Sequence, residues 1–445
     1  MINNLDPQIY DFFVNYLMLT RLWMVMLVEF SVENYRSIGE RATLSMEPSM
    51  AKSKSYNVIK VEKCPTVTEL LKSSAIYGAN ASGKSNVLKS FFIIKSLVIH
   101  SKEMNRGDTF NEYDPFLLDN ESAKKPISFE VKFIIDNTVY RYYFSFNNRV
   151  ILKEELSYYK GKNETFIFKR EKKTLTPFVD HDELDGLFKH TGENVLFLSK
   201  ANNEYEPFGP VFEWFSKTLK FIGTTSNLPP VETVDYMMES EKNRENIVNL
   251  LKYADFNISD VKGQNINVQA SDVQPEIINF FEMVSKKSVN DGQLFRTELK
   301  SIHKRADGSL ITTDFHNFES EGTMTFFKIS GIWLSALKDH QTVLAIDELD
   351  VKLHPDLIMY LLKIFSDPEI NLKNSQLIFT THNTRLLSSD FFRREQIWFT
   401  EKNPITQSTE LYSLYDYEKR NDRSIEKAYL LGKYGGLPDI NYGSL

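Results

Sequence analysis

Apolar and polar positions alternate in several short runs over the first third of the chain. The alternation predicts a strand at residues 27–32 and, after a turn, a returning strand at 42–46. A β-hairpin is expected at 129–146, and two further strands at 150–170. The lysines of the turn between these two strands are expected on a solvated face, and the alternative is a contact with a phosphate backbone. We therefore expect a β-rich lobe.

The periodicity becomes helical between about residues 185 and 290. No heptad pattern persists over several turns, so no long coiled-coil arm is expected. We predict a compact helical insertion that either presents a surface to a partner or only completes the core. The apolar positions that define its helical faces are Ile247, Leu250, Leu251, Ile277, Phe280, Phe281 and Val284.

The composition is that of a soluble globular protein. Of the 445 residues, 42% are hydrophobic and 25% are charged. The net charge of −7 gives no general basic excess, so composition does not argue for nucleic-acid binding, although a local basic face could contact DNA. The single cysteine, Cys64, excludes an intramolecular disulfide framework and a cysteine-rich zinc site. A cytoplasmic protein is expected.

Residues 1–26 contain an apolar stretch that polar residues interrupt. The stretch is too short and too polar to span a bilayer, and no Lys or Arg precedes it as in a secretory signal. We expect either an additional amphipathic helix or a natural start nearer Met26.

A glycine-bracketed loop follows a short predicted strand at residues 74–77 and leads into a helix. Gly78, Gly83, Lys84 and Ser85 fill the GxxxxGK[ST] pattern of a phosphate-binding loop, or P-loop. In such a loop, backbone N–H groups surround phosphate oxygens, the lysine reaches the β- and γ-phosphates, and the serine hydroxyl binds Mg²⁺. The alternative is a glycine-rich turn before an ordinary helix. The residues expected to bind nucleotide here are Gly78, Asn80, Ser82, Gly83, Lys84, Ser85 and Asn86.

Two carboxylates follow the apolar run at 342–346, which predicts a buried strand. Asp347 is expected to hold Mg²⁺, and Glu348 to polarise the water that attacks the γ-phosphate. An apolar run before Asp-Glu is often only structural, but together with the P-loop it indicates an ATPase.

Two weaker signals lie on either side of these acids. Ser320 and Gly322 belong to a Ser-x-Gly-Thr sequence at the start of a predicted helix, which is either an anion site or an ordinary N-cap. A second buried strand is predicted from residue 376 and ends in His382, which is either a γ-phosphate sensor or a structural histidine. We favour the functional interpretation of His382.

Together these motifs resemble the OLD, RecF and SMC branch of ABC-type ATPases, and most closely the AAA fifteen family of bacterial ATPases, which includes RloA-like and AbiL-like phage-defence proteins. The resemblance implies an α/β fold: an ABC-type ATPase head with a β-rich lobe, a P-loop mixed sheet and a compact helical insertion. It also implies that Arg36, in an Asn-aromatic-Arg-Ser turn, lies near the nucleotide or bound DNA; the alternative is a solvated turn arginine. The segments that carry the resemblance are residues 34–37, 78–85, 320–323, 346–348, 353–355, 381–382 and 429–438.

The resemblance also implies a division of the chain. An N-terminal extension at 1–26 precedes a first ATPase lobe at 27–184, a helical insertion at 185–300 and a second ATPase lobe at 301–445. The glutamine usual in such ATPases is missing between residues 86 and 200, and a polar group at 111–114 is a candidate substitute.

The function implied is ATP binding and hydrolysis with Mg²⁺, in a dimer or higher oligomer where residues 320–323 complete the site of a second, head-to-tail copy. The 63 residues after His382 are too few for the TOPRIM domain of OLD nucleases. The chain would then be the sensor or scaffold of an antiphage, abortive-infection system with a separate TOPRIM-like nuclease effector. The alternative is a RecF-like DNA-repair ATPase. A transporter ATPase subunit is disfavoured, because residues 34–37 and 353–355 do not fit it, and no membrane partner is expected.

Overall fold

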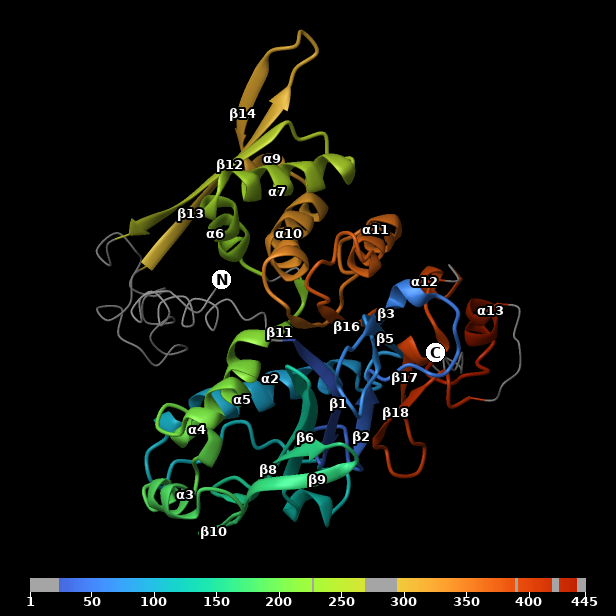
Figure 1. Ribbon diagram of the computed structural model, residues 1–445. Helices are drawn as coiled ribbons and strands as arrows, with labels where there is room; N and C mark the ends of the chain where they lie inside the picture. The colour runs from blue at the N-terminus through green and yellow to red at the C-terminus, as the bar shows by residue number, and fades with distance from the viewer. Residues whose placement is uncertain (1–23, 226–227, 269–293, 389–390, 418–423, 438–445) are drawn as a thin grey trace, which may run out of the picture.

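The computed structural model describes residues 24–225, 228–268, 294–388, 391–417 and 424–437 (Figure 1). It is a mixed α/β structure in which a β-rich layer, a central sheet and a helical layer succeed one another. None of the described helices is long and apolar enough to cross a membrane.

The central sheet has six strands in the order β11-β15-β16-β5-β17-β18. All neighbouring pairs are parallel except β17 and β18. Because parallel strands end at the same edge, the segments that follow β5, β15 and β16 meet there. The strands are β5 (Ser73–Gly78), β11 (Leu219–Ile222), β15 (Val343–Ile346), β16 (Gln376–Thr380), β17 (Ile397–Lys402) and β18 (Thr409–Ser413).

Side chains on the two faces of the central sheet belong to two separate apolar cores. On β5, Ile76 belongs to the core that α2 (Lys84–His100) shares with the β-rich layer. Its neighbours Ala75 and Tyr77 belong to the other core, under α10 (Glu321–Lys338) and α11 (Pro355–Ser366). Successive side chains of a strand point to opposite faces of the sheet. Each face of the central sheet is therefore covered by helices, α2 on one face and α10 and α11 on the other (Figure 1).

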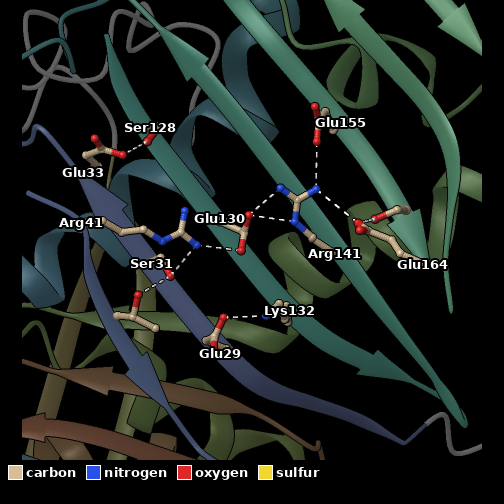
Figure 2. Close-up of polar contacts among 12 residues, drawn as sticks. Glu29, Ser31, Glu33, Arg41, Ser128, Glu130, Lys132, Arg141, Glu155 and Glu164 are labelled. Carbon is tan, nitrogen blue, oxygen red and sulfur yellow. Dashed lines mark hydrogen bonds and ion pairs between the residues drawn. The ribbon is translucent and has the colours of Figure 1, made fainter. Parts of the chain in front are cut away.

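The β-rich layer is a seven-stranded antiparallel sheet in the order β10-β9-β8-β7-β6-β1-β2. It confirms the predicted strand pair, the hairpin and the two strands after it. Charged side chains are paired across its outer face: Arg141 contacts Glu130 at 2.6 Å and Glu155 at 2.9 Å (Figure 2). The strands are β1 (Val25–Glu33), β2 (Ala42–Ser45), β6 (Ile127–Ile135), β7 (Thr138–Phe146), β8 (Ile151–Lys160), β9 (Asn163–Glu171) and β10 (Thr174–Pro177).

The predicted helical insertion includes β-structure as well as helices. As expected, α7 (Glu241–Tyr253) buries Ile247, Leu250 and Leu251, and it follows α6 (Val231–Glu239). A separate antiparallel sheet comes next, made of β12 (Asp260–Val268), β13 (Leu294–Lys304) and β14 (Leu310–Asp314). The pattern did not predict this sheet, because β12 is polar on both faces and its pairing with β13 spans a long sequence separation. The other predicted helical face, Ile277, Phe280, Phe281 and Val284, lies outside the described residues.

Strand pairing crosses the predicted domain boundaries. β11 comes from the segment expected to be the insertion, yet it pairs with β15 in the central sheet. β5 from the first predicted lobe pairs with β16 and β17 from the second. The other strands and α-helices of the described residues are short: β3 (Val58–Lys60), β4 (Glu69–Leu71), α3 (His181–Phe188), α4 (Phe197–Ala201), α5 (Gly209–Glu213), α9 (Phe315–Phe318), α12 (Arg385–Ser388) and α13 (Ile425–Leu430).

Candidate functional site

The P-loop connects the end of β5 to the start of α2. The Lys84 ammonium donates hydrogen bonds across the loop to the carbonyl oxygens of Gly78, at 2.8 Å, and Ala79, at 2.9 Å. Gly83 has a φ of +113°, and a Cβ there would lie 2.2 Å from Thr409 Oγ1. A Cβ at Gly78 would lie 2.4 Å from Thr400 Oγ1. Both positions therefore require glycine.

The first turn of α2 is open to an anion. Its N-cap is Gly83, which supplies no side-chain cap for the N–H groups of that turn. These N–H groups, the helix dipole and the buried Lys84 ammonium together fit a phosphate group. Asn80 is exposed at the tip of the loop, while Ser82 is buried and its hydroxyl lies 2.6 Å from Thr400 Oγ1.

Asp347 follows β15 and lies against the P-loop serine. Its Oδ1 accepts hydrogen bonds from Ser85 Oγ at 3.2 Å and from Thr380 Oγ1 at 2.7 Å, and the residue is 5% exposed. A hydroxyl and a carboxylate brought together beside a phosphate loop are oxygen ligands of the kind that Mg²⁺ takes. The fold therefore brings these two residues together across 262 positions of sequence.

The chain turns sharply between the two acids. Glu348 has a φ of +53°, and its backbone N–H donates to Thr380 Oγ1 at 2.7 Å. Its carboxylate accepts a hydrogen bond from Thr224 Oγ1 at 3.4 Å, so it is only loosely held. The side chain is half-buried, whereas that of Asp347 is buried. The turn thus separates an inner carboxylate from a more accessible one.

His382 lies just past β16 at the same edge of the sheet. Its backbone N–H donates to Asp350 Oδ2 at 3.0 Å. The other carboxylate oxygen of Asp350 is buried and has no hydrogen-bond partner among the described residues. Partial burial and the nearby Lys84 ammonium lower the pKa of His382, although the Asp350, Glu348 and Asp347 carboxylates oppose this. The imidazole is therefore neutral at pH 7.

The lowered pKa of His382 leads to a prediction for the pH profile of ATP hydrolysis. The His382 imidazole becomes protonated only when the pH falls below the ordinary histidine pKa of about 6.5. We expect kcat/KM to stay level near pH 7 and to fall at pH values below 6.5, because a charged imidazole is repelled by the Lys84 ammonium that must bind the same phosphate. In a His382→Gln variant the rate should drop about 100-fold and this acid limb should disappear. Steady-state phosphate release between pH 5 and 8 tests both effects, and an unchanged acid limb in the variant would contradict the assignment.

Arg36 lies in the turn that follows β1 and contacts the predicted polar group at 111–114. Its Nε donates to Asp114 Oδ2 at 2.8 Å, and its side chain is 38% exposed. The next residue, Ser37, accepts a hydrogen bond at 2.7 Å from Asn86 in the first turn of α2. The turn therefore lies beside the P-loop helix, and a role of Arg36 toward nucleotide or DNA stays a prediction.

The Ser-x-Gly-Thr sequence lies at the N-terminus of α10. Ser320 is the N-cap, its Oγ accepting from the Thr323 N–H at 3.1 Å, and it is exposed. A Cβ at Gly322 would lie 3.0 Å from the carbonyl oxygen of Lys352, in the loop after the two acids. Within the described parts of the chain, no hydrogen bond or ion pair joins this sequence to the P-loop.

Several residues at the site carry no motif that sequence reasoning could detect. Thr380 bonds to Asp347 and Glu348, while Thr400 and Thr409 pack against the P-loop glycines from β17 and β18. The C-terminal segment also lies beside the P-loop. A Cβ added at Gly436 would lie 3.5 Å from Gly78 Cα, and the carbonyl oxygen of Gly436 accepts a hydrogen bond from the Tyr429 hydroxyl. Two sequence signals concern these residues: the position of Thr380 at the end of an apolar run, and the resemblance of residues 429–438 to the tail of the AAA fifteen family.

The family described as "AAA domain, putative AbiEii toxin, Type IV TA system" matches residues 73–388. Among solved structures, the SMC head domain from Thermotoga maritima is similar at 13% sequence identity and a TM-score of 0.37, covering 87% of this chain and 98% of that one. No curated protein matches. The family match runs from β5 through the P-loop and both acids to α12, so this chain belongs to that AAA-domain family.

Proposed function

We propose that this chain binds ATP with Mg²⁺ and hydrolyses it to ADP and phosphate. The observation that carries the proposal is the contact between Ser85 Oγ and Asp347 Oδ1, at 3.2 Å. It joins the P-loop to the acid-bearing strand at the edge where three parallel strands end. When bound there, Mg²⁺ would neutralise phosphate charge.

The residues of the chain have distinct roles in this proposal. When ATP binds, the Lys84 ammonium donates to phosphate oxygens in place of the two backbone carbonyl oxygens that accept from it here. Glu348, the more accessible acid, orients the attacking water and accepts its proton. Neutral His382 donates a hydrogen bond to the γ-phosphate, and Asp350 holds the backbone from which that side chain extends. The α2 N-terminus and P-loop amides hold the remaining phosphate oxygens.

The active form in this proposal is a head-to-tail dimer. Ser320 is exposed and has no bond to its own P-loop among the described residues, so it is free to face the nucleotide of a second copy. Two ATP molecules would then lie between two chains, each held by the P-loop of one chain and residues 320–323 of the other.

Mixing two inactive variants tests this shared site. Lys84→Ala removes the P-loop cation, and Ser320→Arg places a bulky charge in the opposing motif. Each variant alone should be inactive. An equimolar mixture should recover about a quarter of the wild-type hydrolysis rate, because half the dimers are mixed and each mixed dimer has one intact site. Activity of Ser320→Arg alone, or no recovery from two folded variants, would contradict the head-to-tail arrangement.

The cellular role that we propose is the sensor or scaffold of an antiphage system with a separate nuclease-like effector, in the cytoplasm. Two things support it: the resemblance of the motifs to the AAA fifteen family, and the description of the matching family as a putative toxin of a Type IV TA system. Co-purification of the tagged chain with the product of a neighbouring gene, and loss of phage protection in Glu348→Gln, would test it. DNA-stimulated hydrolysis without any effector would favour the RecF-like alternative instead.

A further inference from the structure

A surface cleft of about 780 Å³ lies in the β-rich layer, between α3, the loop after α2 and the ends of β8 and β9. Eight of its lining residues are Lys or Arg, and one, Glu193, is acidic. This concentration of positive charge contrasts with the net charge of −7 of the whole chain. We name it the basic cleft and define it by Lys102, Arg106, Arg149, Lys172, Lys189 and Lys200.

The floor of the basic cleft is firmly built. Arg170 is 1% exposed, pairs with the buried Glu154 at 3.2 Å, and donates to the carbonyl oxygen of Val195 at 2.5 Å. Asn194 donates to the carbonyl oxygen of Asn105 at 2.8 Å, which fixes the neighbouring loop to the floor. Buried and partly buried hydrogen bonds therefore hold backbone segments next to which the rim cations lie, at residues 105, 172 and 195.

Most of the charge at the rim is not neutralised within the chain. Arg106, Arg149, Lys172 and Lys189 are all exposed, and none forms an ion pair with a described residue. Among the described residues, three cations of the cleft have acidic partners: Arg170 in the floor pairs with Glu154, Lys173 contacts Glu193 at 2.8 Å, and Lys200 contacts Glu204 at 3.4 Å. Like charges gathered in one concavity attract a partner that brings many negative charges.

We propose that the basic cleft binds the phosphate backbone of a nucleic acid. Cations on four stretches of the chain (102–106, 149, 170–173 and 189–200) surround a space much larger than one phosphate. They match a partner that carries a negative charge at every unit. Two lining side chains have aromatic rings: Phe188 packs against the Arg170 guanidinium at 5.1 Å, and His190 is exposed. Eight cations against these two rings favour contact with phosphates over stacking with bases. Contact is therefore with the backbone and independent of base sequence.

The basic cleft is separate from the ATP site. Lys84 begins the 17 residues of α2, and Lys102 follows its end, so about 25 Å of helix lies between them. Nucleic-acid binding here goes beyond the proposed ATPase activity and does not rest on it. Substitutions in the cleft should leave ATP hydrolysis without nucleic acid unchanged.

The experiment compares two triple variants that each lose three positive charges. The cleft variant carries Arg149→Gln, Lys172→Gln and Lys189→Gln. The control variant carries Lys52→Gln, Lys160→Gln and Lys162→Gln, which are exposed lysines outside the cleft; two of them lie at the turn between β8 and β9. Fluorescence anisotropy measures binding of labelled mixed-sequence single-stranded DNA, duplex DNA and single-stranded RNA of about 20 units, at several salt concentrations.

Wild type should bind at least one of the three probes. The cleft variant should bind it at least 10-fold more weakly at low salt, with the slope of log K against log salt reduced by about 2. The control variant should lose no more than about 2-fold. Thermal unfolding and ATP hydrolysis without nucleic acid check that both variants remain folded.

Three results would overturn the proposal. The first is that wild type binds none of the probes, and the second is that the two variants lose affinity equally. Cleft-dependent binding of polyglutamate or of inorganic phosphate, without binding of any oligonucleotide, would also overturn it. A protein that binds nucleic acid through the cleft but hydrolyses no ATP would contradict the proposed ATPase function alone.

Discussion

Replacing Glu348 with glutamine is expected to slow ATP hydrolysis by about 1,000-fold while leaving ATP binding nearly unchanged. Glutamine keeps the size of the side chain but cannot accept a proton from water. Because Glu348 is half-buried and its carboxylate has only a 3.4 Å contact with Thr224, the substitution should not disturb the fold. Phosphate release measures hydrolysis, and a fluorescent ATP analogue measures binding.

The control for this prediction is Glu369→Gln, an exposed acid in the loop after α11, which should leave both quantities unchanged. Glu348→Gln should also accumulate as a dimer in the presence of ATP and Mg²⁺, because the bound nucleotide is not consumed. Light scattering after gel filtration measures the mass. A variant that binds ATP but stays monomeric would argue against the head-to-tail site, and one that hydrolyses ATP normally would exclude Glu348 as the base.

The central part of the site could be predicted because its signals are local. The glycine spacing of the P-loop fixes a turn between a strand and a helix, and an apolar run before two acids fixes a buried strand that ends in carboxylates. A parallel sheet then brings such strand ends together without further information. The 3.2 Å contact of Ser85 with Asp347 is where these two local patterns meet.

The residues that complete the P-loop could not be predicted, because their contacts are not local. Thr400 and Thr409 reach residues 78–83 only after β17 and β18 have joined the sheet beside β5. The sequence around a threonine in a strand does not indicate which glycine its side chain will contact in the folded protein. The same reason explains why β12 and β13 could not be predicted: neither strand has a clear apolar alternation, and their backbone hydrogen bonds form only once both strands are present.

Replacing Lys84 with alanine is expected to weaken ATP binding by about 100-fold or more and so abolish hydrolysis at ordinary nucleotide concentrations. Lys84 is 6% exposed, and burial lowers the pKa of its ammonium while the Asp347, Glu348 and Asp350 carboxylates oppose that shift. Its two bonds to backbone carbonyls, at 2.8 and 2.9 Å, hold the cation where phosphate oxygens would replace them. Equilibrium binding of a fluorescent ATP analogue measures the loss.

A matched control lies one turn further along the same helix. Lys89 is exposed on α2, so Lys89→Ala removes an equal charge from the same element without touching the loop, and ATP binding should change by no more than about 2-fold. Equal losses in the two variants would mean that only the general positive field of α2 attracts the nucleotide. A large loss confined to Lys84→Ala requires a contact at one place, because only Lys84 spans the loop between Gly78 and the first turn of α2.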